Sequence, residues 1–243
     1  MAGHSKWSKV KRLKGALDSK RSKIFAKLAR EITVAAKMGG GDPDMNPRLR
    51  MILLKCRAAN MPADNIDRAI KKGTGGGEGA NFEDLTYEIY GPHGVALLVE
   101  VSTDNRNRTA ADVRSIVTKN NGSIATAGSV SRLFQRKGQI VVSRENASED
   151  KLMEVALEAG AEDFKTEAEG FEILTEPANF EAVHKKIETA GVKCEVAEIT
   201  ALPTIMTPLS GGATVAAVNK LIDELEDHDD IKEVFSNAEF PDT

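Results

Sequence analysis

Residues 139–199 read QIVVSRENASEDKLMEVALEAGAEDFKTEAEGFEILTEPANFEAVHKKIETAGVKCEVAEI, and this stretch decides the fold. Short apolar runs typical of strands alternate with two segments in which apolar residues recur at helical spacing. The predicted strands and helices follow the order βαββαβ, at 139–142, 148–158, 163–166, 171–175, 178–189 and 194–199. This is the order of a ferredoxin-like sandwich.

If that unit is self-contained, the segments on either side of it must complete each other. Upstream, the sequence predicts strands at 85–90, 95–101 and 129–134 and a helix at 106–119. Downstream it predicts a helix at 213–225 and a strand near 231–235. Together these flanks form a second α+β sandwich. We therefore expect a discontinuous α+β domain, residues 81–137 plus 204–243, with an inserted ferredoxin-like α+β domain at 138–203.

Residues 1–80 are predicted to form a basic helical domain that ends in the glycine-rich linker 73–79. In the predicted helix 19–38, apolar residues fall on one side and cations on the other, so Lys23 and Lys27 are expected to face solvent. The predicted fold class is thus multidomain α and α+β. An N-terminal helical bundle is followed by two ferredoxin-like α+β domains, one inserted in the other.

Composition narrows the class of protein. The chain has 243 residues, of which 41% are hydrophobic, enough to bury real cores. Its 2 cysteines cannot supply a disulfide framework or a four-ligand zinc site. Its apolar runs are shorter than the roughly 20 residues that span a bilayer, and its basic N-terminus has no apolar core of a secretory signal behind it. We expect a cytoplasmic protein without a membrane partner.

The net charge of −4 hides a strong asymmetry. Residues 1–80 carry a net +11, residues 81–144 a net +2, and residues 145–243 a net −17. This sorting suggests a front that binds a polyanion and a rear that the same polyanion repels. The alternative is a set of solvated helix faces whose signs happen to be sorted.

The sequence contains few residue patterns that are typical of a catalytic or metal-binding site. The 4 histidines lack metal-ligand spacing, and the sequence has no nucleophile elbow. The glycine run 73–79 follows a helix and lacks the Lys-Ser/Thr of a phosphate-binding loop. Both cysteines fit buried structural thiols. We predict no catalytic residue, no metal ligand and no cofactor, and hence a protein that is not an enzyme.

The polyanion signal is stronger. We predict nucleic-acid binding by a basic arm and the cationic helix face that follows it, through Lys6, Lys9, Lys11, Arg12, Lys14, Lys20, Arg21, Lys23, Lys27 and Arg30. Arg106 and Arg108, at the start of the predicted helix 106–119, are added as candidates. They could face an anion together with free backbone N–H groups, or pair with acidic groups of the inserted domain.

Several motifs together resemble the YebC/PmpR family of probable transcriptional regulatory proteins, over essentially the whole chain. They are Met1-Ala2-Gly3-His4-Ser5-Lys6-Trp7, Ala59-Asn60-Met61-Pro62 with Asp64-Asn65-Ile66, Tyr90-Gly91-Pro92-His93-Gly94-Val95-Ala96, Thr103-Asp104-Asn105-Arg106-Asn107-Arg108-Thr109 and Gly128-Ser129-Val130-Ser131. His93 stands where the family usually has glycine. The resemblance implies a three-domain fold without an enzymatic site.

The resemblance also implies two molecular roles. Bacterial members are described as DNA-binding transcriptional regulators. Mitochondrial relatives look like translational activators of cytochrome oxidase, and some bacterial members act at the ribosome on proline-rich stretches. We expect a DNA-binding regulator of transcription. The alternative is a ribosome-associated translation factor that contacts ribosomal RNA, with the acidic C-terminal domains meeting ribosomal proteins. A third hypothesis is a protein-interaction scaffold that docks through its acidic rear.

Overall fold

The computed structural model describes Trp7 and residues 21–75 and 82–241. The predicted basic arm, apart from Trp7, and most of the predicted linker 73–79 lie outside the described residues. The predicted combination of helices and β-sheets is confirmed, and the two four-stranded sheets are antiparallel. In the described part of the chain, every helix is too short or too polar to cross a membrane.

The first described unit, here the helical unit, contains three helices, α2 (Arg21–Gly39), α3 (Pro47–Ala58) and α4 (Ala63–Thr74). Its core forms around Ile32, Leu49 and Cys56, which are fully buried. Asn46 fixes the connection between α2 and α3. Its Oδ1 accepts the Leu49 N–H at 3.1 Å, and its Nδ2 donates to the carbonyl oxygens of Ala35 and Gly40.

Gly73 has a packing role. The predicted linker 73–79 begins at this residue, but α4 continues through Thr74. A Cβ atom at position 73 would lie 2.5 Å from the carbonyl oxygen of Thr33 on α2. Glycine is needed there because the two helices approach too closely for a side chain.

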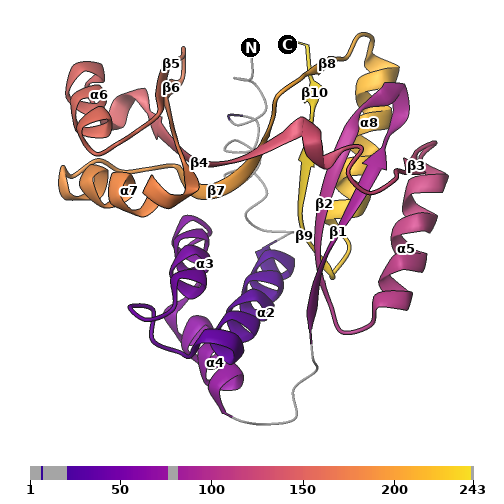
Figure 1. The fold of residues 1–243 in the computed structure, drawn as a ribbon, viewed down its shortest axis with the longest axis horizontal. Coiled ribbons are helices and arrows are strands. Elements are labelled where there is room, and N and C mark those ends of the chain that lie inside the picture. Colours follow the sequence, from indigo (N-terminus) through magenta and orange to yellow (C-terminus); the bar gives the residue numbers. More distant parts are fainter. Residues whose placement is uncertain (1–6, 8–20, 76–81, 242–243) are drawn as a thin grey trace.

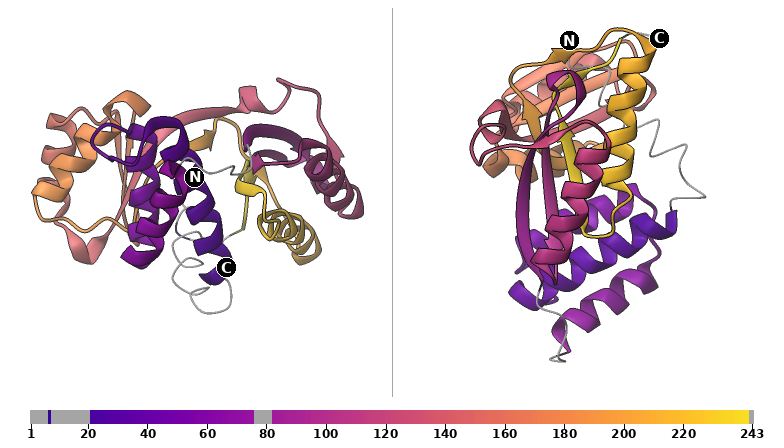
Figure 2. Two further views of the ribbon diagram at one scale, coloured as in Figure 1. Left: turned by 90° about the horizontal axis from the view of Figure 1, so that it is seen from below. Right: turned by 90° about the vertical axis from the view of Figure 1, so that its right-hand side faces the viewer.

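The first sheet joins distant parts of the sequence. It has the order β3-β1-β2-β9, and every neighbouring pair is antiparallel. Its strands are β1 (Glu83–Tyr90), β2 (Ala96–Thr103), β3 (Ser123–Ile124) and β9 (Ile231–Ser236). Helices α5 (Arg106–Lys119) and α8 (Gly212–Glu226) lie side by side on one face of it (Figures 1 and 2). Their buried contacts include Val99, Val113 and Leu221.

The predicted strand at 129–134 is wrong. Residues 131–133 form a 3-10 turn, η2, and a strand begins only at Phe134. The carboxylate of Glu88 on β1 accepts the backbone N–H groups of Gly128, Val130 and Ser131 at 2.6–2.8 Å. Burial alone would raise the pKa of Glu88, but these donors outweigh it and lower the pKa. The loop is therefore held by a side chain and not by a strand partner.

The second sheet has the order β5-β6-β4-β7, again with antiparallel neighbours. Its strands are β4 (Phe134–Ser143), β5 (Asp163–Thr166), β6 (Gly170–Thr175) and β7 (Val196–Pro203). Helices α6 (Glu149–Glu158) and α7 (Phe180–Thr189) cover one face, over a core that includes Ile140 and Phe171. The helical unit meets both sheets, with α3 next to β7 (Figure 1).

Shorter elements complete the chain. They are the 3-10 turns η1 (Pro92–Gly94), η3 (Arg144–Asn146) and η4 (Pro177–Asn179), and the parallel pair β8 (Thr207–Pro208) and β10 (Ala238–Glu239). Within η1, His93 has φ = 60°. This is the left-handed region that glycine occupies most easily and that other residues adopt rarely.

Trp7 is anchored on the open face of the second sheet, away from α6 and α7. Its ring is 6% exposed and packs on Val141 and Val196. Its Nε1 donates to Oε2 of Glu167 at 2.7 Å. The start of the chain is thereby tied to a sheet formed by residues far along the sequence.

The anchoring of Trp7 can be tested by fluorescence, because it is the only tryptophan in the chain. Glu167→Ala leaves the buried indole N–H without its acceptor, a cost of about 1–3 kcal/mol. We expect a red-shifted emission maximum and stronger acrylamide quenching. Glu169→Ala, which removes an exposed carboxylate from the same loop, is the matched control. Equal spectra for the two variants would contradict the anchor.

Candidate nucleic-acid interface

The predicted nucleic-acid-binding residues fall into two groups. Lys6, Lys9, Lys11, Arg12, Lys14 and Lys20 lie outside the described residues. The others lie on α2 and in the first turn of α5, and are Arg21, Lys23, Lys27, Arg30, Arg106 and Arg108. The structure places the α2 group next to the first sheet, and brings Arg30 and Arg108 together on one carboxylate.

The cationic face of α2 lies against the last residue of α8 and the four residues that follow it, here called the acidic turn (226–230). Lys23 pairs with Asp227 at 3.6 Å, and Lys27 donates to the carbonyl oxygen of Glu226. Burial lowers the pKa of Lys27, although the carboxylates of the acidic turn oppose this. The expectation that Lys27 faces solvent is therefore wrong, because its polar helix face meets an acidic segment. Lys23 remains half-exposed.

Asp230 is the centre of this contact. Its carboxylate is 4% exposed and accepts hydrogen bonds from Arg30 and Arg108, both at 2.8 Å. The hydroxyl of Thr109 donates to it at 2.7 Å, and the hydroxyl of Thr103 lies 2.7 Å from that of Thr109. Although burial raises the pKa of Asp230, these donors lower it to about 2. One carboxylate thus joins the helical unit to the first sheet.

The Thr103–Thr109 motif is explained by this arrangement. Asn105 caps α5 by accepting the Arg108 N–H at 3.1 Å. Arg108 binds Asp104 at 2.9 Å as well as Asp230. Arg108 therefore pairs with acidic groups, but neither of them belongs to the region 138–203 where such partners were expected. Arg106 is exposed.

The cations of α3 also bind carboxylates of other elements. Two of them bind the first sheet: Arg48 pairs with Asp84 of β1 at 2.7 Å, and Lys55 pairs with Glu233 of β9 at 3.0 Å. The other two bind α7: Arg50 pairs with Glu181 at 3.0 Å, and Arg57 pairs with Glu188 at 3.8 Å. The nearby Glu233 carboxylate raises the pKa of Lys55 despite its burial. Many cations of the basic N-terminal region thus pair with carboxylates of the same chain. Asp230 and Glu233 are not among the predicted site residues, because in the sequence both belong to the acidic rear, for which no specific partner could be predicted.

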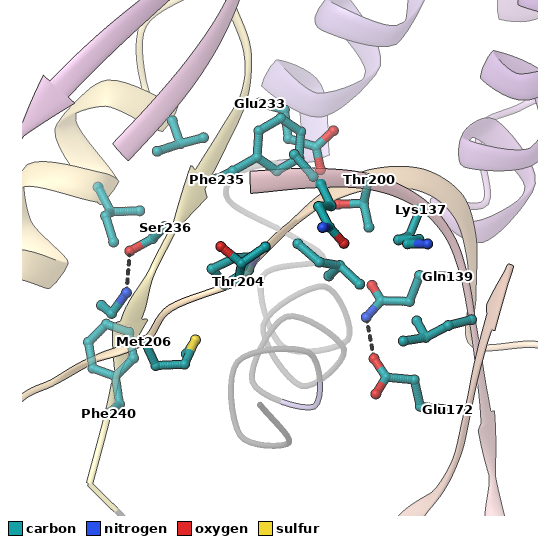
Figure 3. Close-up of a pocket in the computed structure, with 18 of the residues that line it drawn as sticks. Lys137, Gln139, Glu172, Thr200, Thr204, Met206, Glu233, Phe235, Ser236 and Phe240 are labelled. Atoms are coloured by element: carbon teal, nitrogen blue, oxygen red, sulfur yellow. Dashed lines mark hydrogen bonds between the residues drawn. The ribbon is translucent and has the colours of Figure 1, made fainter. Parts of the chain in front are cut away.

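A cleft of about 710 Å³ lies between the second sheet and the C-terminal strands (Figure 3). Polar groups in its wall are already paired, Gln139 with Glu172 at 2.6 Å and Lys137 with Glu162 at 2.6 Å. The opposite wall is mainly apolar and includes Met206, Phe235 and Phe240. Lys137 and Lys165, the cations among the described residues of the cleft, are both paired with carboxylates, so this described lining offers no open cationic site for phosphates.

Reactive groups are few in the described part of the chain. Burial raises the pKa of Cys56 to about 11 and that of Cys194 to about 12. Both thiols are therefore protonated at neutral pH and poorly nucleophilic. Among the described residues, His, Cys, Asp and Glu side chains form no cluster of three or more that could hold a metal ion.

Comparisons with known proteins cover both the helical unit and the two sheets. Residues 5–76 match the family model of the TACO1/YebC protein N-terminal domain, and residues 82–238 that of the TACO1/YebC second and third domain. A probable transcriptional regulatory protein of Desulforapulum autotrophicum is 55% identical, covering 100% of this chain and 98% of the relative. One of Geobacillus thermodenitrificans is 53% identical, covering 98% and 97%.

A solved structure has the same architecture. The crystal structure of the conserved hypothetical protein Aq1575 from Aquifex aeolicus is similar with a TM-score of 0.82. The two chains are 44% identical, and the similarity covers 93% of each.

The role of Asp230 predicts a pH-dependent loss of stability. Asp230→Asn removes the negative charge between Arg30 and Arg108, and we expect a loss of about 3 kcal/mol at pH 7 in urea unfolding. The folded-state pKa of about 2 lies below the ordinary 3.8. The contribution of the ionised group is therefore present above pH 3.8 and is lost as pH falls toward 2.

The difference between wild type and Asp230→Asn should shrink over that pH interval. Asp229→Asn, at an exposed neighbour in the same turn, should change stability by less than about 0.5 kcal/mol. Equal losses in the two variants would show that Asp230 has no special role.

Proposed function

Because this chain belongs to the TACO1/YebC family, we propose that it is a non-enzymatic regulator of gene expression that binds nucleic acid through its N-terminal region. The relatives from Desulforapulum and Geobacillus are named probable transcriptional regulatory proteins. The role that we propose first is therefore DNA-binding regulation of transcription in the cytoplasm.

The observation that carries this proposal is the concentration of cations ahead of α2. Residues 6–20 include Asp18 as their one carboxylate and the cations Lys6, Lys9, Lys11, Arg12, Lys14 and Lys20. Such a segment attracts phosphates of any sequence and releases their counterions. Arg21 and Arg106 are exposed and extend the candidate surface. The proposed surface also includes four cations that in this structure bind the acidic turn, namely Lys23, Lys27, Arg30 and Arg108.

The second candidate function is a ribosome-associated translation factor that contacts ribosomal RNA and assists synthesis of proline-rich stretches. The position of α3 favours it. Met51 and Leu54 of α3 pack against the core of the second sheet, and its cations bind carboxylates. The long connection around Gly40 and Asn46 also differs from the tight turn of a helix-turn-helix. These features favour contact with phosphates and RNA shape over reading of a major groove.

Binding of duplex DNA should depend steeply on salt. If about five cations engage phosphates, the log–log slope is about −4.5, and affinity falls roughly 500-fold between 50 and 200 mM salt. Replacing Lys9, Lys11, Arg12 and Lys14 by Gln removes four cations, and the log–log slope should become less negative by about 3.6. The matched control replaces four exposed lysines of the second-sheet region by Gln, at Lys151, Lys185, Lys186 and Lys193. A flat salt response of the wild type would contradict nucleic-acid binding.

The two candidate functions differ in the nucleic acid that they contact in cells. Ultraviolet crosslinking of the full chain, with DNA and RNA sequenced from one purification, separates them. Enrichment of a few promoter fragments, lost in the arm variant and kept in the lysine control, is expected for a transcriptional regulator. Ribosomal RNA crosslinks clustered at one place would instead establish the translation role.

A further inference from the structure

We propose that the acidic turn (226–230) competes with nucleic acid for the cations of α2, so that the free protein holds part of its nucleic-acid surface closed. The inference rests on the proposed function and adds regulation of the same surface. It concerns the contact between α2 and the residues after α8, which are about 200 positions apart in sequence.

The first step of the argument is that the turn offers a row of oxygen acceptors to one helix face. The carboxylate of Asp227 meets Lys23, and the carbonyl oxygen of Glu226 meets Lys27. One turn further along the helix, Arg30 donates to the carbonyl oxygen of Asp229 at 3.1 Å and to the carboxylate of Asp230.

The second step is chemical. Ammonium and guanidinium groups bind carboxylate and phosphate oxygens with the same donors, and an N–H group that points at one cannot serve the other. A nucleic-acid strand on this face of α2 would need the donors of Lys23 and Lys27 that the turn now uses. The turn therefore stands in the place of a phosphate backbone.

The third step concerns strength. The Lys23–Asp227 pair is about half-exposed on both sides, and exposed pairs contribute only about 0.2–1 kcal/mol. Asp230 is by contrast buried and held by Arg30, Arg108 and the Thr109 hydroxyl. The outer end of the contact is thus weak enough for a polyanion to displace, while Asp230 keeps the turn in place.

The test removes charge from the exposed side chains of the turn and leaves Asp230 intact. Asp227→Asn/Asp229→Asn is compared with wild type in binding to a fluorescent 30-base-pair duplex DNA, at fixed salt. We expect about fivefold tighter binding, from the loss of the weak Lys23–Asp227 pair and of the negative charge of Asp229 near Lys27. The matched control, Glu154→Gln/Glu158→Gln, removes the same charge from exposed residues of α6. Thermal unfolding of each variant verifies that it is folded.

A double-mutant cycle tests whether the tighter binding of the turn variant depends on the cations of α2. In a Lys23→Gln/Lys27→Gln background, the same turn substitutions should no longer tighten binding. Unchanged affinity of the turn variant, an equal gain in the α6 control, or a gain that persists without Lys23 and Lys27 would each overturn the competition. Absence of salt-dependent binding by the wild type would instead overturn the proposed function itself, so the two failures are distinguishable.

Discussion

The carboxylate of Asp230 is the constraint on which the arrangement of the helical unit and the first sheet depends. It is buried, and a buried charge is tolerated only when it is paired and hydrogen-bonded. The two guanidinium groups that neutralise it come from different parts of the chain, Arg30 from α2 and Arg108 from α5. Any separation of these parts leaves an unpaired charge behind, so this single residue couples their positions.

Electrostatics therefore serves two purposes on the same helices. Cations of α2 and α3 attach the helical unit to acidic residues of the first sheet, of the acidic turn and of α7, while the arm before α2 carries the charge proposed for nucleic acid. Salt screens exposed pairs of either kind. Increasing ionic strength will consequently weaken intramolecular contacts together with binding, and each change must be measured separately.

Sequence reasoning succeeded where local periodicity decides the structure. The bounds of α5 agree with the predicted helix 106–119, because its apolar spacing and its Asn105 cap are both local. It failed at 129–134, where Glu88, about 40 positions away, takes the backbone amides. It also failed for Lys27, since periodicity identifies a polar helix face and not the acidic segment that covers it. The division into three domains, one discontinuous, stays a prediction.

The way the chain enters and leaves the second sheet has an evolutionary consequence. Strands β4 and β7 pair from Phe134 with Pro203 onward, and just before them the Thr204 N–H donates to the carbonyl oxygen of Leu133 at 2.8 Å. The two ends of the segment 134–203 therefore lie side by side. If the segment were removed, a short link between residues 133 and 204 would rejoin the remaining chain. Acquisition of this segment by an ancestral gene would also have covered Leu98 and Phe235 of the first sheet, because these residues share a buried cluster with Phe134 and Ala201.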